Sequence, residues 1–324
     1  MARTVGTRIL ERSIIKHLEK SAGVGVGNDY SVLGDGSTVL AMGFADEGYD
    51  LSALSGKEKL STGEMALVRA LNNLACSGAA PKEMTISIQA GSNCPEQLLR
   101  DEMLILSTAA KKRGIKIIGG NTVYGDDGDS YNVTLTVYGS LDKDAAEIDK
   151  KPKPGDLVFV IGNVGHLGAS MLAIKNKDKI LERLPETYIQ SALMDVDDME
   201  ISDAADMLFG VGAYYIHDIT FGGVYRALLE TSMHFGMGID VIHEKLPIRQ
   251  DTIEICEVLG MNPYEITGTG GVVGVCHEDR AAQLEEALKG SGIPYSFAGK
   301  LTVEKKRVVR FEINPMERSI TFYE

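Results

Sequence analysis

The stretch Lys150-Lys-Pro-Lys-Pro-Gly155 and the apolar run Leu157-Val-Phe-Val-Ile161 that follows it indicate how the chain is divided into domains. Two prolines and three lysines between strand-like segments are typical of a linker, so we place a domain boundary at residue 150. The apolar run leads into Gly162-Asn-Val-Gly-His-Leu-Gly168, which indicates a strand, a glycine loop and a helix. We therefore expect two domains, residues 1–150 and 151–324.

Hydrophobic periodicity predicts helices and strands mixed in both halves of the chain. Helices are expected over residues 8–20, 63–77, 222–234, 252–259 and 280–289, with a further helix that begins at Glu96. Strands are expected over residues 38–44, 84–89, 115–118, 131–138, 157–161, 238–242 and 272–276. This order of elements indicates an α/β fold.

Composition and charge exclude several classes of protein. The 324 residues include 33 Lys and Arg against 46 Asp and Glu, and the net charge of -13 repels nucleic acid and anionic lipid surfaces. A nucleotide can still bind, because one triphosphate needs only local backbone N–H groups, a cation or a metal ion. No uninterrupted apolar run approaches the roughly 18 residues of a membrane span. We expect a cytoplasmic protein with no membrane and no nucleic-acid partner.

The four cysteines give no sign of a metal site or a disulfide framework. Cys76, Cys94, Cys256 and Cys276 form no Cys-x-x-Cys pair and have no His at zinc-ligand spacing. We expect free thiols in a reducing compartment.

Glycine loops and turn carboxylates are the first candidates for chemistry. Gly162–Gly168 could direct backbone N–H groups at a phosphate, but a plain tight turn has the same pattern. It has neither the dinucleotide-binding spacing nor the P-loop lysine. Asp29 lies in a glycine turn and Asp46 at a strand end, where carboxylates can hold Mg²⁺ or simply face solvent.

Three further segments carry polar side chains at the ends of elements. Asn72 and Asn73 lie inside a predicted helix, where Asn is an unfavourable residue. The run Gly119-Gly-Asn-Thr122 ends a predicted strand. The run His217-Asp-Ile-Thr-Phe-Gly-Gly223 leads from a strand into a helix, and its histidine could be a general base or a structural residue.

Taken in order, these segments resemble the aminoimidazole ribonucleotide synthetase superfamily, which also contains selenophosphate synthetase, thiamine monophosphate kinase and the hydrogenase-maturation carbamoyl dehydratase. The family reads Gly-Asp-Asp-Ala-Ala-Val at residues 27–32, Asn-Asp-Leu-Ala-x-x-Gly-Ala at 72–79, Gly-Gly-Asp-Thr at 119–122 and Asp-x-Thr-x-Gly-Gly at 218–223. The segment Leu259-Gly-Met-Asn-Pro-Tyr264 is most similar to the hydrogenase-maturation branch. The resemblance spans nearly the whole chain.

The resemblance implies a two-domain α/β fold of the aminoimidazole ribonucleotide synthetase type. In that fold the N-terminal mixed sheets of two subunits pair into a shared barrel, and the C-terminal domain is an α/β sandwich. A homodimer with ATP near the subunit interface is implied. The implied reaction transfers the γ-phosphoryl group of ATP to an amide or similar oxygen of a small or protein-borne substrate.

The resemblance also assigns roles to residues of this chain. Asp218 and Asn121 are expected to be catalytic, and Mg²⁺ is expected on Asp29, Asp46, Asn73 and Asn121. The residues expected to bind ATP are Asp29, Asp46, Asn72, Asn73, Gly119, Gly120, Asn121, Thr122, Thr220, Gly222 and Gly223.

The chain departs from the family pattern in two ways. Asn28, Asn73 and Asn121 stand where the family has Asp, so each removes a negative charge from the expected Mg²⁺ site and should weaken metal binding. The sequence also ends Ser319-Ile-Thr-Phe-Tyr-Glu324, without the C-terminal cysteine of the hydrogenase-maturation branch, and it lacks the N-terminal cysteine or selenocysteine of selenophosphate synthetase.

Three readings of function stay open. The first is an ATP-dependent phosphoryl-transfer enzyme, similar to the hydrogenase-maturation factor. The second is a catalytically weak nucleotide-binding partner or assembly protein for metalloenzyme maturation, which the Asn replacements favour. The third is a kinase similar to thiamine monophosphate kinase. Against all of these, the glycines could serve only turns and the asparagines only backbone capping.

Overall fold

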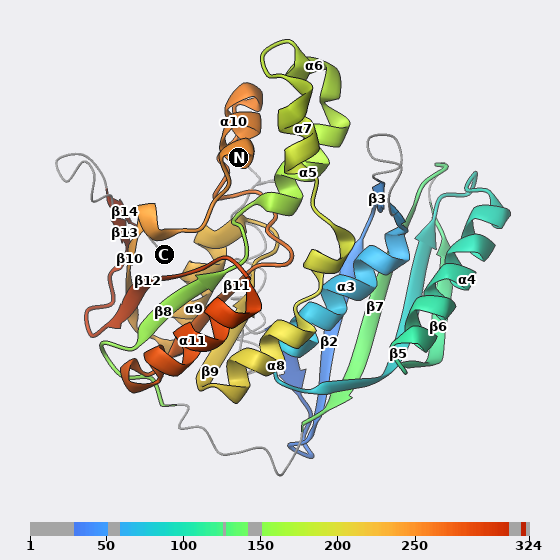
Figure 1. The fold of residues 1–324 in the computed structure, drawn as a ribbon. Coiled ribbons are helices and arrows are strands. Elements are labelled where there is room, and N and C mark those ends of the chain that lie inside the picture. Colours follow the sequence, from blue (N-terminus) through green and yellow to red (C-terminus); the bar gives the residue numbers. More distant parts are fainter. Residues whose placement is uncertain (1–28, 51–58, 126–127, 142–150, 311–318, 322–324) are drawn as a thin grey trace, which may run out of the picture.

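The structure is a computed structural model that describes residues 29–50, 59–125, 128–141, 151–310 and 319–321. These residues form two mixed α/β units, each built on its own sheet (Figure 1). The helix predicted over 8–20 and Asn28 lie outside the described residues. Within the described ranges, no helix has the length and apolar character needed to cross a membrane.

The first unit is a five-stranded sheet with two helices on one face (Figure 1). Its strands, in spatial order, are β1 (Tyr30–Val32), β2 (Thr38–Ala45), β7 (Tyr131–Ser140), β5 (Ala80–Ala90) and β6 (Lys116–Tyr124). The helices are α3 (Thr62–Ala75) and α4 (Glu96–Lys112). The strands β3 (Tyr49–Asp50) and β4 (Lys59–Leu60) form a separate two-stranded antiparallel sheet. All strand pairs of the larger sheet are antiparallel except β5 with β6.

Helix α3 closely matches the helix predicted over 63–77, and its start has a clear local cause. The Ser61 hydroxyl accepts from the Glu64 N–H while the Glu64 carboxylate accepts from the Ser61 N–H, which is a capping box. The helix then packs directly on β2, because Gly43 has no side chain. A Cβ at Gly43 would lie 2.1 Å from the carbonyl oxygen of Ala66.

The second unit is a seven-stranded sheet. Its spatial order is β14 (Ser319–Thr321), β13 (Arg307–Arg310), β10 (Gly238–Ile242), β12 (Tyr295–Thr302), β8 (Leu157–Ile161), β11 (Val272–Cys276) and β9 (Ala213–Asp218). Helix α9 (Gly223–Phe235) covers one face, and α8 (Ser202–Gly210) and α11 (Ala281–Ser291) cover the other. Helices α5 (His166–Lys175), α6 (Lys177–Leu181), α7 (Glu186–Ala192) and α10 (Gln250–Leu259) form a separate layer (Figure 1).

The apolar strands were predictable to the residue. β8, β10 and β11 have the predicted bounds. β8 and β11 are continuous apolar runs, which suit strands that are buried on both faces, whereas β10 has the partly buried Asp240 between Ile239 and Val241. The edge strand β6 differs, since it was expected to end at Ile118 but continues to Tyr124 by pairing with β5. Gly120 permits this pairing, because a Cβ there would lie 2.3 Å from the Ile86 carbonyl oxygen.

The two units share a packed boundary. Helix α3 contacts β2 and β7 on one side and α8 and β9 on the other. Tyr49 of β3 hydrogen-bonds Ser170 of α5 at 2.5 Å, and its hydroxyl also donates to the Met194 carbonyl at 2.8 Å. The core of the first unit therefore continues into the second, through Leu167, Met194 and Met199.

The predicted mixed α/β fold on two sheets is confirmed. The four cysteines are buried free thiols, as predicted.

Candidate functional site

The candidate site lies at the boundary between the two units and is centred on His217, at the end of β9. The His217 ring is bonded on both sides by carboxylates: Nδ1 lies 2.5 Å from Oδ2 of Asp29, and Nε2 lies 2.9 Å from Oε2 of Glu230. Asp29 directly precedes β1 of the first unit, whereas Glu230 lies on α9 of the second. His217 therefore links a segment of the first unit to a helix of the second.

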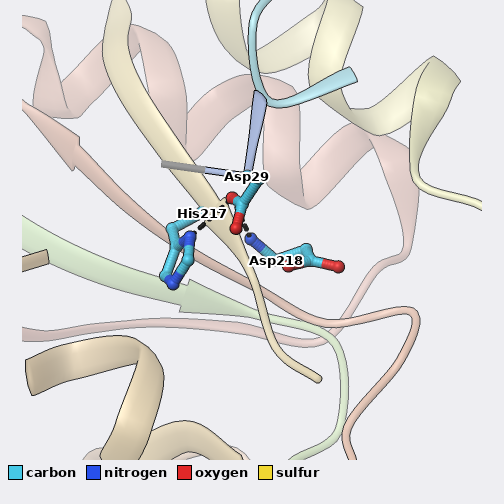
Figure 2. A group of neighbouring side chains, drawn as sticks. All are labelled: Asp29, His217 and Asp218. Atoms are coloured by element: carbon cyan, nitrogen blue, oxygen red, sulfur yellow. Dashed lines mark hydrogen bonds and ion pairs between the residues drawn. The ribbon is translucent and has the colours of Figure 1, made fainter. Parts of the chain in front are cut away.

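Asp218 completes this group beside His217. Its N–H donates to Oδ2 of Asp29 at 3.3 Å, and Figure 2 shows the Asp29 carboxylate between the His217 ring and this N–H. Asp218 is 3% exposed, and its Oδ2 has no hydrogen-bond partner among the described residues. One ligand atom from each of Asp29, His217 and Asp218 lies within 4.8 Å of the other two.

Charge and burial act in opposite directions on these groups. Burial lowers the pKa of His217, but the Asp29 carboxylate and the hydrogen bonds to Asp29 and Glu230 outweigh burial and raise it well above its ordinary value. Burial and the Asp29 charge together raise the pKa of Asp218 well above its usual range. Burial raises the pKa of Glu230, yet His217 and Arg226 lower it overall. The site thus favours a charged imidazole between two carboxylates.

Glu230 is held in place by its own helix. Arg226 lies one turn earlier on α9, and its Nε donates to Oε1 of Glu230 at 2.8 Å. Because Arg226 takes one carboxylate oxygen and His217 the other, the Glu230 side chain is fixed in one orientation. The resulting chain of contacts runs from Arg226 through Glu230 and His217 to Asp29.

A buried arginine lies at the same boundary. Arg69 of α3 is 7% exposed, and its Nη1 donates to the Phe44 carbonyl at 2.7 Å. Its guanidinium carbon lies 4.8 Å from the ring centroid of Phe221. Burial lowers the pKa of Arg69, and the charges of Asp46, Glu47 and Asp218 partly offset this effect. Arg69 therefore lies between the end of β2 and the turn that follows β9.

The turn after β9 contains three of the residues predicted to bind ATP: Thr220, Gly222 and Gly223. The Gly223 N–H donates to the Thr220 carbonyl at 3.1 Å, and Gly222 and Gly223 have φ of 86° and 66°. A Cβ at Gly223 would lie 2.3 Å from the Tyr264 carbonyl oxygen, so only glycine fits there. The glycine pair opens α9 with backbone N–H groups at its start.

The two neighbouring asparagines have different surroundings. Asn72 is fully buried; its Nδ2 donates to the Met199 carbonyl at 2.8 Å, and its Oδ1 accepts from the Ile201 N–H at 3.0 Å. Asn73 is partly exposed, and its Nδ2 donates to the Met42 carbonyl at 2.7 Å. Asp46 is exposed at the end of β2. Asn72 thus joins the two units, and its role in binding ATP stays a prediction.

The residues predicted on β6 lie elsewhere on the first sheet. Gly119, Gly120, Asn121 and Thr122 are exposed on this edge strand. Three strand spacings separate β6 from β2, which is about 14 Å. Within one chain the described structure therefore brings Asp29 and Asp218 together but leaves Asn121 on the edge strand β6, three strands away from β2 and Asp46.

Sequence reasoning missed three residues of this boundary: Arg69, Arg226 and Glu230. Arg226 and Glu230 have the i, i+4 spacing of a helical ion pair directly after the glycine turn, which could have indicated them. Arg69 lies within the apolar segment from Met65 to Leu71 of α3, and a charge at such a position is a sign of a buried role.

Two family models match the chain. The model described as AIR synthase related protein, N-terminal domain, matches residues 34–141. The model described as AIR synthase related protein, C-terminal domain, matches residues 153–312.

Curated relatives are about one-quarter identical to this chain over the aligned regions. A putative hydrogenase expression/formation protein of Methanocaldococcus jannaschii is 26% identical over 249 residues, which cover 76% of this chain and 72% of that protein. Carbamoyl dehydratase HypE of Azotobacter vinelandii is 24% identical over 256 residues, which cover 77% of this chain and 72% of the enzyme.

Solved structures have the same fold. HypE from a HypE–HypF complex gives a TM-score of 0.75 at 21% identity and covers 96% of this chain and 99% of its own. HypE in complex with ATP gives 0.71 at 18% identity, with 98% and 96% covered. The resemblance predicted from the motifs, including that to the hydrogenase-maturation branch, is confirmed. Because the two family models together match well over half of its length, the chain belongs to the AIR synthase related protein family.

Proposed function

We propose that the chain is an ATP-dependent enzyme that transfers the γ-phosphoryl group to an amide or similar oxygen. The acceptor is a small or protein-borne substrate, and the process is the maturation of a metalloenzyme such as a hydrogenase. Curated relatives are named carbamoyl dehydratase HypE and hydrogenase expression/formation protein, which supports this class of process.

The observation that carries the proposal is the meeting of Arg69, Asp46 and the Thr220–Gly223 turn at the boundary between the units. Phosphoryl transfer depends mainly on positioning and charge neutralisation. Arg69 supplies a fixed cation between the end of β2 and the turn. The start of α9 supplies backbone N–H groups and the positive end of a helix dipole, which suit a phosphate group.

Two neighbouring structures support ATP as the phosphoryl donor. One is HypE in complex with ATP. The other is a thiamine monophosphate kinase complexed with AMPPCP and TMP, which has a TM-score of 0.66 and 15% identity and covers 100% of both chains. In our proposal Asp218 is the catalytic carboxyl group nearest the acceptor.

Mg²⁺ would enter with ATP and be held chiefly by Asp46. Among the four residues predicted for this ion, Asp46 offers an exposed carboxylate at a strand end. Asp29 is engaged by His217, and the Asn73 amide nitrogen is bonded to the Met42 carbonyl. Asn73 and Asn121 carry neutral amides, so they add no negative charge to the Mg²⁺ site where carboxylates would. We therefore expect weak binding of Mg²⁺ without nucleotide.

A homodimer is part of the proposal. The face of the first sheet opposite α3 and α4 exposes Met42 by 54%, Phe44 by 43% and Val123 by 47%. A second copy pairing through this face would bury these side chains. In the register of β5 and β6, Asn121 lies opposite Ser87, whose side chain is on the same uncovered face. Dimer formation through this face would therefore also bring Asn121 towards the partner subunit. Sedimentation or light scattering should give twice the mass of 35.0 kDa.

Calorimetric titration of ATP, with and without Mg²⁺, tests the function. We expect micromolar binding that Mg²⁺ strengthens, and slow release of phosphate that a suitable amide substrate accelerates. Asp46→Asn should weaken binding in the presence of Mg²⁺ only, whereas the exposed control Asp206→Asn on α8 should leave it unchanged. Absence of ATP binding to the folded chain would refute the proposal.

A second candidate function is a nucleotide-binding assembly partner without turnover. The neutral partly exposed Asn73 and the remote Asn121 favour it, because both lower the negative charge available to Mg²⁺. ATP binding that ignores Mg²⁺, with no phosphate release, would support this candidate. Phosphorylation of added thiamine monophosphate would instead favour the kinase reading.

A further inference from the structure

The turn after β9 carries an exposed aromatic side chain beside the residues proposed to hold phosphate. Phe221 lies between Thr220 and Gly222 and is 56% exposed. A single large apolar side chain on a protein surface is common and needs no special explanation. Phe221 differs from such a residue because a buried cation lies against its ring.

The cation is Arg69 of α3. Its guanidinium carbon lies 4.8 Å from the centroid of the Phe221 ring, which is the arrangement of a cation–π contact. Arg69 is only 7% exposed, and the hydrogen bond from its Nη1 to the Phe44 carbonyl holds it in place. Because Arg69 covers one face of the ring, the exposed area of Phe221 is chiefly the other face and the edge. The ring is therefore a platform that is supported from behind and open in front.

An independent observation comes from the Nε of Arg69. This N–H is buried and has no hydrogen-bond partner among the residues that the structure describes. Nε is bonded directly to the guanidinium carbon, so it lies beside the Phe221 ring. Buried donors without a partner are rare in native proteins, and each calls for a group that binds there. A ligand that stacks on Phe221 and carries an acceptor oxygen past the edge of the ring would supply that partner.

The place of Phe221 in the chain points to the phosphoryl acceptor rather than to the adenine of ATP. Phe221 follows Asp218, the proposed catalytic carboxyl group, by three residues and belongs to the turn proposed to hold phosphate. A ribose and two phosphates separate adenine from the γ-phosphorus, so the adenine ring lies away from this turn. The acceptor must contact the γ-phosphorus and therefore lies beside it.

We propose that Phe221 determines specificity by stacking on a planar aromatic or heteroaromatic ring of the acceptor, whose amide oxygen accepts from the Nε of Arg69. This role depends on the proposed function and adds the class of acceptor: an amide attached to a planar ring, rather than a carbamoyl group without one. Aromatic rings prefer offset stacking on one another, which strengthens binding beyond the burial of apolar area.

The test compares two amides that differ in the character of the ring. Benzamide has a planar aromatic ring, whereas cyclohexanecarboxamide has a saturated ring with the same number of carbons. Each is titrated into the full chain in the presence of Mg²⁺ and AMPPCP, an analogue of ATP that does not transfer its phosphoryl group, and binding is followed by saturation-transfer NMR. We expect benzamide to bind about tenfold more tightly, as stacking on an aromatic side chain predicts.

Substitutions at position 221 separate stacking from a structural role. Phe221→Leu keeps an apolar side chain on the turn but removes the ring, so the preference for benzamide should disappear. Phe221→Trp should restore the preference, because an indole also offers a face for stacking. The ratio of the two affinities is compared within each variant, so that a change in the amount of folded protein does not alter the result. Tyr188→Leu is the matched control, since it removes an aromatic ring from α7 in the separate helical layer.

Four results would overturn the proposal while leaving the proposed function intact. They are equal binding of the two amides to the wild-type chain, an unchanged preference in folded Phe221→Leu, competition of benzamide with ATP, and failure of wild-type protein that still binds ATP to bind either amide. Dissociation of the dimer in Phe221→Leu would also overturn it, because the ring would then contact a second copy of the chain. Absence of ATP binding to the wild-type chain would refute the proposed function and this role of Phe221 together.

Discussion

Replacing Asn72 by Ala should destabilise the chain far more than replacing its neighbour Asn73. The Asn72 side chain is fully buried and hydrogen-bonds the Met199 carbonyl and the Ile201 N–H. Alanine leaves both backbone groups buried without a partner, at about 1–3 kcal/mol each. We expect the free energy of unfolding to fall by roughly 2–6 kcal/mol, which is a large share of the 5–15 kcal/mol typical of a domain.

Asn73→Ala is the matched control, since it removes one partly exposed hydrogen bond to Met42. Its cost should be about 0.5–1.5 kcal/mol. The chain has no Trp, so far-UV circular dichroism during urea unfolding is the suitable probe. The two units can unfold separately, so the transition must first be shown to coincide with the one that a second probe, such as tyrosine fluorescence, reports.

The outcome also separates two roles for Asn72. A structural role predicts lower stability with ATP affinity unchanged at temperatures where the variant is folded. Equal stability of the Asn72→Ala and Asn73→Ala variants would refute the reasoning. Loss of ATP binding at unchanged stability would instead support the role predicted from the family motif.

Three further predictions concern the boundary and its surroundings. Arg69→Gln should weaken ATP binding about tenfold or more in calorimetry, because it removes a charge-assisted contact to phosphate. Burial and Arg249 lower the pKa of His166 to about 4, below its ordinary value, so the unfolded chain takes up a proton first as pH falls. Stability should thus decrease by about 3 kcal/mol between pH 6.5 and 4, and His166→Gln should remove that part in urea titrations. Gly223→Ala should cost at least about 2 kcal/mol, but Gly236→Ala, with open space around its Cβ, only about 1 kcal/mol.

The central strands β8 and β11 of the second sheet could be predicted because they are continuous apolar runs. The bounds of β10 were also predicted, from its short β-branched pattern between Gly238 and Ile242. Strand β12 was missed because polar Ser296 and Lys300 interrupt its apolar pattern, so that its pairing with β8 and β10 decides its structure. Strand β6 continues past Gly119 and Gly120 for the same reason. Pairing between distant strands is a tertiary effect that local patterns do not contain.

The candidate site could likewise be predicted only where its structure has a local cause in the sequence. The turn Thr220–Gly223 was predictable, since its glycines have a local conformational cause. The contact of Asp29 with His217 was not, because 188 positions separate the two residues. His217 alone could be interpreted as a general base or as a structural residue. Only the fold shows that both of its ring nitrogens face carboxylates.

The distribution of charge follows from these contacts and bears on the proposed function. Asn73 lies on α3 and Asn121 on the edge strand β6, and both are neutral where the family pattern has a carboxylate. Loss of charge at these two positions weakens the attraction for hydrated Mg²⁺. Asp29 and Glu230 keep their carboxylates, but both are bonded to His217 and therefore compensate little for that loss. The exposed Asp46 is thus left as the principal acidic group for Mg²⁺, which is why free Mg²⁺ should bind weakly until nucleotide supplies further oxygen ligands.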